Sequence, residues 1–181
     1  LCIRLHNIRK MTPLVLLALL SFALAQDDCP ETFEKIGSGG CCYQFSVVHG
    51  GIQKDWSGAK ASCRALGELL GMTIELAELS TGNGCCNDVE LMNTIASKGE
   101  INSWVGGSDT LSEGQYVWDY SGSILEVTNA LWSHDSPAGG ADENCVQVYS
   151  EPDMVVADDG YRASLNDQEC SLVSHYVCQI F

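Results

Sequence analysis

Cysteine is the residue type in this chain with the most chemistry to offer. The 181 residues include ten cysteines, and so many in a chain of this length indicate either disulfide bonds or bound metal. Zinc sites usually contain Cys-x-x-Cys pairs or closely spaced histidines. The sequence has no Cys-x-x-Cys pair, and its four histidines are scattered. Disulfide bonds are therefore the expected use of these cysteines.

Acidic residues are the second group with chemical potential. The chain has 24 Asp and Glu against 9 Lys and Arg, and its net charge is −15. This balance argues against nucleic acid as a partner, because phosphate binding needs basic side chains, and against strong attraction to anionic membrane surfaces. An acidic surface suits divalent cations, although such a composition most often serves solubility alone.

No pattern in the sequence predicts an enzyme. Acyl transfer would call for a nucleophile motif such as Gly-x-Ser-x-Gly, which the chain lacks. A pair of carboxylates can hydrolyse glycosides, but nothing singles out such a pair among the 24 acidic residues. We therefore predict a binding protein.

An apolar segment near the start predicts secretion. Residues 14–25 are apolar or small, follow Arg9 and Lys10, and end in a small-x-small motif at Ala25. A membrane span needs about 20 apolar residues, so this segment fits a cleaved signal peptide better than an uncleaved anchor. We expect residues 1–25 to be upstream sequence and signal peptide, with Met11 as initiator. Residues 26–181 are then one secreted, extracellular domain with no membrane span.

The elements that must position these groups are two helices followed by short strands. Apolar residues spaced three and four apart predict helices over residues 56–70, ending near Gly71, and 87–98. A tight loop is expected at residues 82–86, between the helices. Short apolar runs among Gly, Ser, Asp and Asn predict strands at residues 42–48, 104–105, 116–118, 145–149 and 176–178. This order predicts an α+β domain.

Several motifs occur in an order typical of one protein family. In chain order they are Cys29-Pro30, Cys42-Tyr43, Trp56…Ala59…Cys63 with Leu69, Trp104-Val105-Gly106-Gly107, Gly114-Gln115-Tyr116-Val117-Trp118 with Gly122, Trp132…Pro137…Glu143-Asn144-Cys145, and Leu165-Asn166-Asp167…Cys170 with Cys178. Over residues 29–181 the chain resembles a C-type lectin-like domain of the long form. The resemblance implies two helices packed on small antiparallel sheets, with a long loop region and disulfide bonds as staples.

The same resemblance implies a disulfide pattern. Its pairs are Cys29–Cys42, Cys63–Cys178 and Cys145–Cys170. Beyond that pattern, we expect one extra bridge from Cys41 to Cys85 or Cys86, because both segments are predicted loops. Loss of Cys2 with the signal peptide leaves an odd number of cysteines. The last cysteine would then be free or would link two chains in a disulfide-bonded dimer.

In sugar-binding members of the family, a calcium ion on the long loop coordinates sugar hydroxyls. The positions that match its ligands here are Glu143, Asn166 and Asp167, which offer the carboxylate and amide oxygens that calcium prefers. Two further ligand positions flank Pro137, and they hold Ser136 and Ala138. Ser136 is a poor calcium ligand, and Ala138 has no side-chain oxygen.

Other residues near these positions are weaker candidates. Asp135 and Asp142 could replace the missing calcium ligands, and His134 could contact a bound ligand. The triplet Glu151-Pro152-Asp153 has the composition of a ligand motif but follows Cys145, whereas the family's triplet precedes that cysteine. We predict that residues 150–160 form an inserted hairpin tip. A solvated acidic loop is the favoured interpretation, because charge clusters are usually solvated, and a second calcium or ligand contact is the alternative.

The resemblance implies a secreted carbohydrate-binding protein, with calcium-linked recognition of cell-surface or microbial glycans in innate defence. The competing hypothesis is a calcium-independent module of the same fold that binds a protein or another non-sugar surface. Ser136 and Ala138 favour this alternative, whereas Glu143, Asn166 and Asp167 favour calcium. Which sugar is bound is not indicated.

Overall fold

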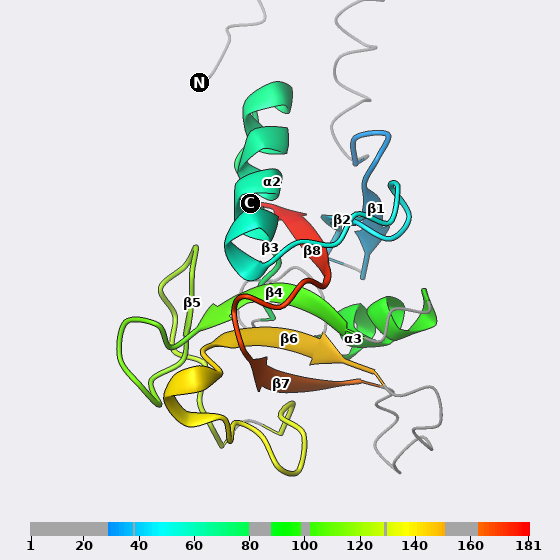
Figure 1. The fold of residues 1–181 in the computed structure, drawn as a ribbon. Coiled ribbons are helices and arrows are strands. Elements are labelled where there is room, and N and C mark those ends of the chain that lie inside the picture. Colours follow the sequence, from blue (N-terminus) through cyan, green and yellow to red (C-terminus); the bar gives the residue numbers. More distant parts are fainter. Residues whose placement is uncertain (1–28, 38, 80–87, 99–101, 129, 151–162) are drawn as a thin grey trace, which may run out of the picture.

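The computed structural model describes residues 29–181 except 38, 80–87, 99–101, 129 and 151–162 (Figure 1). Its elements are β1 (Glu34–Ile36), β2 (Cys41–Phe45), α2 (Trp56–Leu70), β3 (Ile74–Leu76), α3 (Asp88–Ser97), β4 (Asn102–Ser108), β5 (Val117–Trp118), the 3-10 turn η2 (Gly140–Asp142), β6 (Cys145–Tyr149), β7 (Ser164–Gln168) and β8 (His175–Ile180). The predicted signal peptide, the predicted loop at 82–86 and nearly all of the predicted hairpin at 150–160 lie outside the described residues. Among the described residues, no helix has the length and apolar character needed to cross a membrane.

The last strand of the chain joins the two halves of the sheet. The strand order is β1-β2-β8-β4-β6-β7, with β3 paired to β8 and β5 paired to β4. The β4–β8 pair is parallel, so the sheet is mixed, while the other pairs are antiparallel. In Figure 1, α2 and β3 lie at one end, and β4, β6 and β7 lie at the other end with the long loops. This arrangement leaves β7 at an edge of the sheet, where a loop can cover it.

Helix α2 has the bounds that its sequence predicts. The Asp55 side chain accepts a hydrogen bond from the Gly58 amide at 2.6 Å, which caps the first turn. Gly71 ends the helix with φ of 66°, a left-handed conformation that glycine adopts without steric cost. The buried positions are Trp56, Ala59, Cys63 and Gly67, spaced three or four residues apart. They form the single apolar stripe that packs against the sheet.

Helix α3 lies within its predicted range. Leu91, Met92 and Ile95 are buried on its inner face. Asp88 begins the helix and is also buried, which raises the pKa of its carboxyl group to about 6. A buried carboxylate of this kind costs folding free energy whenever it is ionised.

The buried apolar residues form two clusters. One contains Trp104 together with the inner face of α2, and the other contains Trp118 and Trp132. The indole N–H of Trp104 donates to the Lys54 carbonyl at 3.0 Å, and that of Trp56 donates to the Val105 carbonyl at 2.9 Å. The buried tryptophans are core residues, as their motif context predicts, and the indole N–H groups of Trp56 and Trp104 have backbone partners.

Disulfide bonds tie the helix, the sheet and the loops together. They join Cys29 to Cys42, Cys63 to Cys178 and Cys145 to Cys170, the pairs that the family resemblance implies. Cys41 is also disulfide-bonded. Its expected partners, Cys85 and Cys86, lie outside the described residues.

Candidate functional site

The candidate site lies where the loop before η2 runs along the edge of β7. The Leu165 amide donates to the Leu131 carbonyl at 2.7 Å, and the Ser133 amide donates to the Leu165 carbonyl at 2.9 Å. Trp132 forms a parallel bridge with Leu165. The loop backbone thus pairs briefly with β7, and the residues that follow lie beside that strand. We call residues 132–139 the ligand loop.

Beyond the backbone bridge, two side chains of β7 accept hydrogen bonds from the ligand loop. The Ser136 hydroxyl donates to the Asn166 side-chain carbonyl, and the Ser133 hydroxyl donates to Ser136 at 2.7 Å. Asp167 Oδ2 accepts the amide N–H of Ala138 at 2.8 Å and that of Gly139 at 2.9 Å. The peptide bond between Ser136 and Pro137 is cis.

Tyr116 links the ligand loop to Glu143. Its hydroxyl lies 3.3 Å from both the Glu143 backbone carbonyl and Asp167 Oδ2. Its ring meets the Trp132 ring edge-to-face, with centroids 5.1 Å apart. Burial and then the negative charge of Asp167 raise the pKa of the Tyr116 hydroxyl far above its usual range. The hydroxyl therefore stays protonated and acts as a donor.

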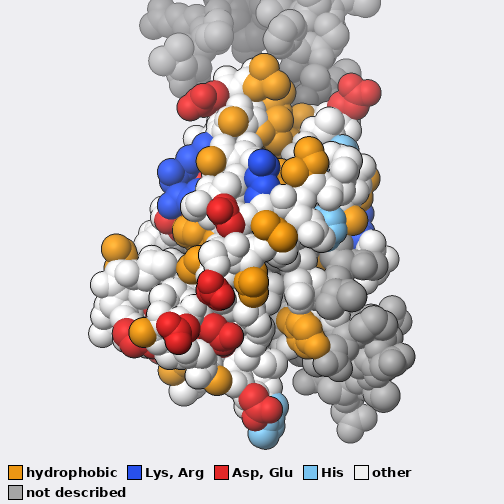
Figure 2. All heavy atoms as spheres, viewed as in Figure 1, with side chains coloured by type: hydrophobic (Ala, Val, Ile, Leu, Met, Phe, Trp, Pro, Cys, Tyr) orange, Lys and Arg blue, Asp and Glu red, His pale blue; other side chains and the backbone are white. Residues whose placement is uncertain are grey.

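Negative charges converge around Glu143. Burial raises the pKa of the Glu143 carboxyl, and the charges of Asp167, Asp142 and Glu169 raise it further. Figure 2 shows acidic side chains gathered on the part of this face near η2 and the loop between β4 and β5. Like charges held this close favour either a proton or a bound cation.

Asp109 belongs to the same region and was not among the predicted site residues. Its side chain is buried, and its amide donates to the Asn144 carbonyl at 3.1 Å. Oδ2 accepts the Gly114 amide at 2.8 Å, whereas Oδ1 has no hydrogen-bond partner among the described residues. Asp109 directly follows β4, but the predicted strand ended at residue 105, and one acidic residue among many does not stand out in the sequence.

The remaining predicted residues lie outside this hydrogen-bond network. His134 Nδ1 and Asp135 Oδ1 contact each other at 2.8 Å, and both side chains are at least 95% exposed. Asp142 is exposed within η2. The acidic triplet at residues 151–153 falls outside the described part of the chain.

Two of the predicted calcium ligands already have hydrogen-bond partners in the ligand loop. Calcium takes six to eight oxygen ligands at about 2.3–2.6 Å. The Asn166 oxygen and Asp167 Oδ2 already accept hydrogen bonds from the ligand loop. Within the described ranges, no three His, Cys, Asp or Glu side chains are grouped to hold a metal ion. A bound cation would give Asp109 Oδ1 a partner and would offset the negative charges around Glu143.

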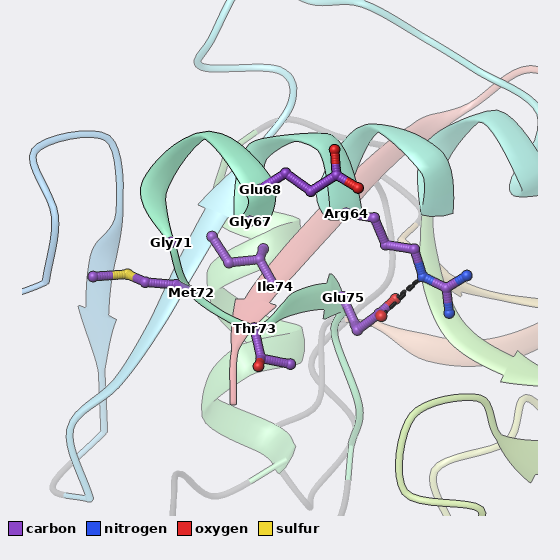
Figure 3. Close-up of a pocket in the computed structure, with 8 residues that line it drawn as sticks. All are labelled: Arg64, Gly67, Glu68, Gly71, Met72, Thr73, Ile74 and Glu75. Atoms are coloured by element: carbon purple, nitrogen blue, oxygen red, sulfur yellow. Dashed lines mark hydrogen bonds and ion pairs between the residues drawn. The ribbon is translucent and has the colours of Figure 1, made fainter.

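A shallow hollow of about 470 Å³ lies away from the ligand loop, between the end of α2 and β3 (Figure 3). Its one cation among the lining residues, Arg64, points to Glu75, and the Arg64 Nε lies 2.8 Å from each carboxylate oxygen. Arg64 also lies 3.6 Å from Asp119. Since this cation is already neutralised, the hollow offers no clear complement to a charged ligand.

Curated proteins similar to this chain are C-type lectins. Salivary C-type lectin 2 of Aedes albopictus is 25% identical over 170 residues, covering 93% of this chain and 97% of that protein. Salivary C-type lectin 1 of the same organism is 23% identical over 167 residues, covering 92% and 94%. No protein-family model matches the chain.

Solved structures with the same fold are C-type lectin domains and their relatives. The C-type lectin CEL-I from Cucumaria echinata superimposes with a TM-score of 0.62 at 18% identity, covering 85% of this chain and 98% of that one. Herring type II antifreeze protein superimposes with a TM-score of 0.55 at 22% identity, covering 83% and 97%. The chain has the C-type lectin fold, and that fold serves more than one function.

Proposed function

We propose that this C-type lectin-like chain is a secreted carbohydrate-binding protein that recognises cell-surface or microbial glycans in innate defence. It binds them with the ligand loop and the adjoining side chains of β7. The observation that carries the proposal is the convergence of Glu143, Asn166 and Asp167 beside the ligand loop of a C-type lectin fold. The salivary C-type lectins that resemble the chain over most of its length support it. Secretion is supported by the predicted signal peptide.

Sugar recognition requires polar groups that can pair with hydroxyls. Glu143 is partly buried and accepts hydrogen bonds when ionised, and the half-buried Asn166 amide can donate as well as accept. The exposed His134 lies within the ligand loop and can contact a bound glycan at its rim. A second copy joined through the remaining cysteine would raise avidity without any new contact.

A glycan array tests this proposal. Protein comprising residues 26–181 is applied in calcium and again in EGTA, beside Glu143→Gln and Asn166→Ala. Glu143→Gln removes the negative charge that strengthens its hydrogen bonds, and a hydrogen bond to a charged group contributes about 1.5–3 kcal/mol. The variant should therefore bind roughly tenfold more weakly. Glu68→Gln, an exposed acid on α2, is the matched control and should bind like the wild type. Absence of glycan binding in both buffers would refute the proposal.

Calcium is the finer part of the proposal and has its own test. If Glu143, Asn166 and Asp167 bind calcium, calorimetric titration of chelator-stripped protein gives sub-millimolar affinity that is lost in Glu143→Gln and Asp167→Asn. When bound, the ion would coordinate sugar hydroxyls directly. No heat and no shift in melting temperature up to about 10 mM, beyond the weakest extracellular calcium sites, would exclude this role.

A second candidate function is calcium-independent binding of a protein or another non-sugar surface. Two observations favour it: Ala138 brings no side-chain ligand, and the Asn166 and Asp167 oxygens are engaged by the loop itself. The likeness to an antifreeze protein is consistent with other uses of this fold. A glycan array without hits, followed by capture of one defined protein partner that Asn166→Ala abolishes, would support this alternative.

A further inference from the structure

Hydrogen bonds between side chains of β7 and the ligand loop form a continuous series. The backbone bridge at Leu165 is followed by the Ser136 hydroxyl on Asn166, and then by two amides on Asp167. We call the contacts of residues 136, 138 and 139 with Asn166 and Asp167 the loop latch. Both partners advance along the chain in the same direction, so each contact supports the next.

The chemistry of the latch is specific to its residue types. Ser136 accepts from Ser133 and donates to Asn166, which uses both capacities of a hydroxyl group. Asp167 receives two amides on one carboxylate oxygen, with the Tyr116 hydroxyl at the longer distance of 3.3 Å. Hydrogen bonds to an ionised acceptor are roughly twice as strong as neutral ones.

The latch engages oxygens of two predicted calcium ligands, because Asn166 Oδ1 accepts from Ser136 and Asp167 Oδ2 accepts from Ala138 and Gly139. An ion bound by this pair would have to share those oxygens or use the other Asp167 oxygen. Asp167 is only 1% exposed. If its carboxylate turned away from the loop, the partly buried amides of Ala138 and Gly139 would lose their acceptor. Such unsatisfied donors are costly, which gives the loop a strong preference for the latched conformation.

We propose that the loop latch holds the ligand loop in its binding conformation in calcium-free protein, with Asp167 as the positioning residue. The reference to binding rests on the proposed function, but the conformation of the loop does not. The latch is a property of the protein alone, and it can be measured without any glycan. Its ligand-binding consequence is that recognition by the loop requires no metal to shape it.

Amide hydrogen exchange, resolved by residue with NMR, tests the latch. In wild-type protein in EGTA, the Ala138 and Gly139 amides should be protected at least tenfold relative to an unstructured peptide. Adding calcium chloride should change that protection less than twofold. Unprotected amides in EGTA that become protected only after calcium is added would overturn the proposal.

Variants separate positioning from metal binding. Asp167→Ala should remove the protection at Ala138 and Gly139 while the central strand residue Val146 keeps its own. Asp167→Asn, which retains an oxygen acceptor, should restore part of it, and Glu68→Gln should match the wild type. Equal loss in both Asp167 variants, or unchanged protection in Asp167→Ala, would contradict the acceptor role. If Asp167→Ala does not fold, the Ser136→Ala variant and the wild-type protection measured in EGTA and in calcium test the latch instead.

The proposal and the proposed function fail in different ways. Protected amides with no glycan binding would support the latch and refute the lectin function. Glycan binding with unprotected amides in EGTA would support the lectin function and refute the latch.

Discussion

Gly139 is the residue whose replacement tests the site geometry most sharply. A Cβ atom built on Gly139 would collide with Cβ, Cγ and Oε2 of Glu143. Because the Glu143 Cβ is fixed by the backbone, rotation of the side chain cannot relieve the clash. Gly139→Ala must therefore move the backbone of η2 or push Glu143 out of the site. Overpacking of this kind costs about 1–3 kcal/mol.

The matched comparison is Gly140→Ala. A Cβ there meets nothing within 4 Å, but Gly140 has φ of +53°, which a non-glycine residue adopts at a cost of about 1–2 kcal/mol. Both variants should therefore lose similar stability in urea denaturation. Only Gly139→Ala should also lose glycan binding, roughly tenfold, because only it displaces Glu143. Equal glycan binding by the two variants, or full wild-type stability of Gly139→Ala, would refute the packing of Glu143 over Gly139.

Three further predictions concern stability and assembly. Burial raises the pKa of Asp88 from its ordinary value of 3.8 to about 6 in the folded protein, so this group destabilises the fold as pH rises between those values. Asp88→Asn should be more stable than the wild type by about 2–3 kcal/mol at pH 7.5 and no more stable at pH 4. Urea titrations that give the same stability difference between variant and wild type at both pH values would contradict this. Glu78 is buried and accepts hydrogen bonds from the Tyr120 and Ser121 amides at 2.8 and 2.9 Å. Glu78→Ala should therefore lower the free energy of unfolding by about 1–3 kcal/mol, and an unchanged melting temperature would contradict this. If cleavage after Ala25 removes Cys2 as predicted, nine cysteines remain. Non-reducing gels should then show a dimer band that a reductant removes, and a purely monomeric band would exclude a covalent dimer.

The helices were predictable from the sequence because their signals are local. Asp55 and Gly71 cap α2, and the apolar stripe between them has helical spacing. Short strands carry weaker signals: β3 has only three residues and directly follows a helix. Its position becomes clear from its pairing with β8, more than a hundred residues later. Such long-range pairing leaves no local pattern to recognise.

The candidate site was predictable in its residue types but not in its bonds. Motif order identified Glu143, Asn166 and Asp167, yet the hydrogen bonds from Ser136 and Gly139 depend on how a loop folds back across about thirty residues. The buried Asp109 carboxyl had no distinguishing pattern at all. A motif records which side chains come together, whereas the partners of each polar atom depend on the three-dimensional path of the loop.

Glycan binding by the ligand loop is the claim that most needs a direct measurement. An array probed with protein comprising residues 26–181 and with a Glu143→Gln/Asn166→Ala double variant, both in EGTA and in calcium, would provide it. We predict a set of glycans bound by the wild type and lost by the double variant, while Glu68→Gln retains them. No bound glycan in either buffer, or equal binding by the double variant, would contradict the account.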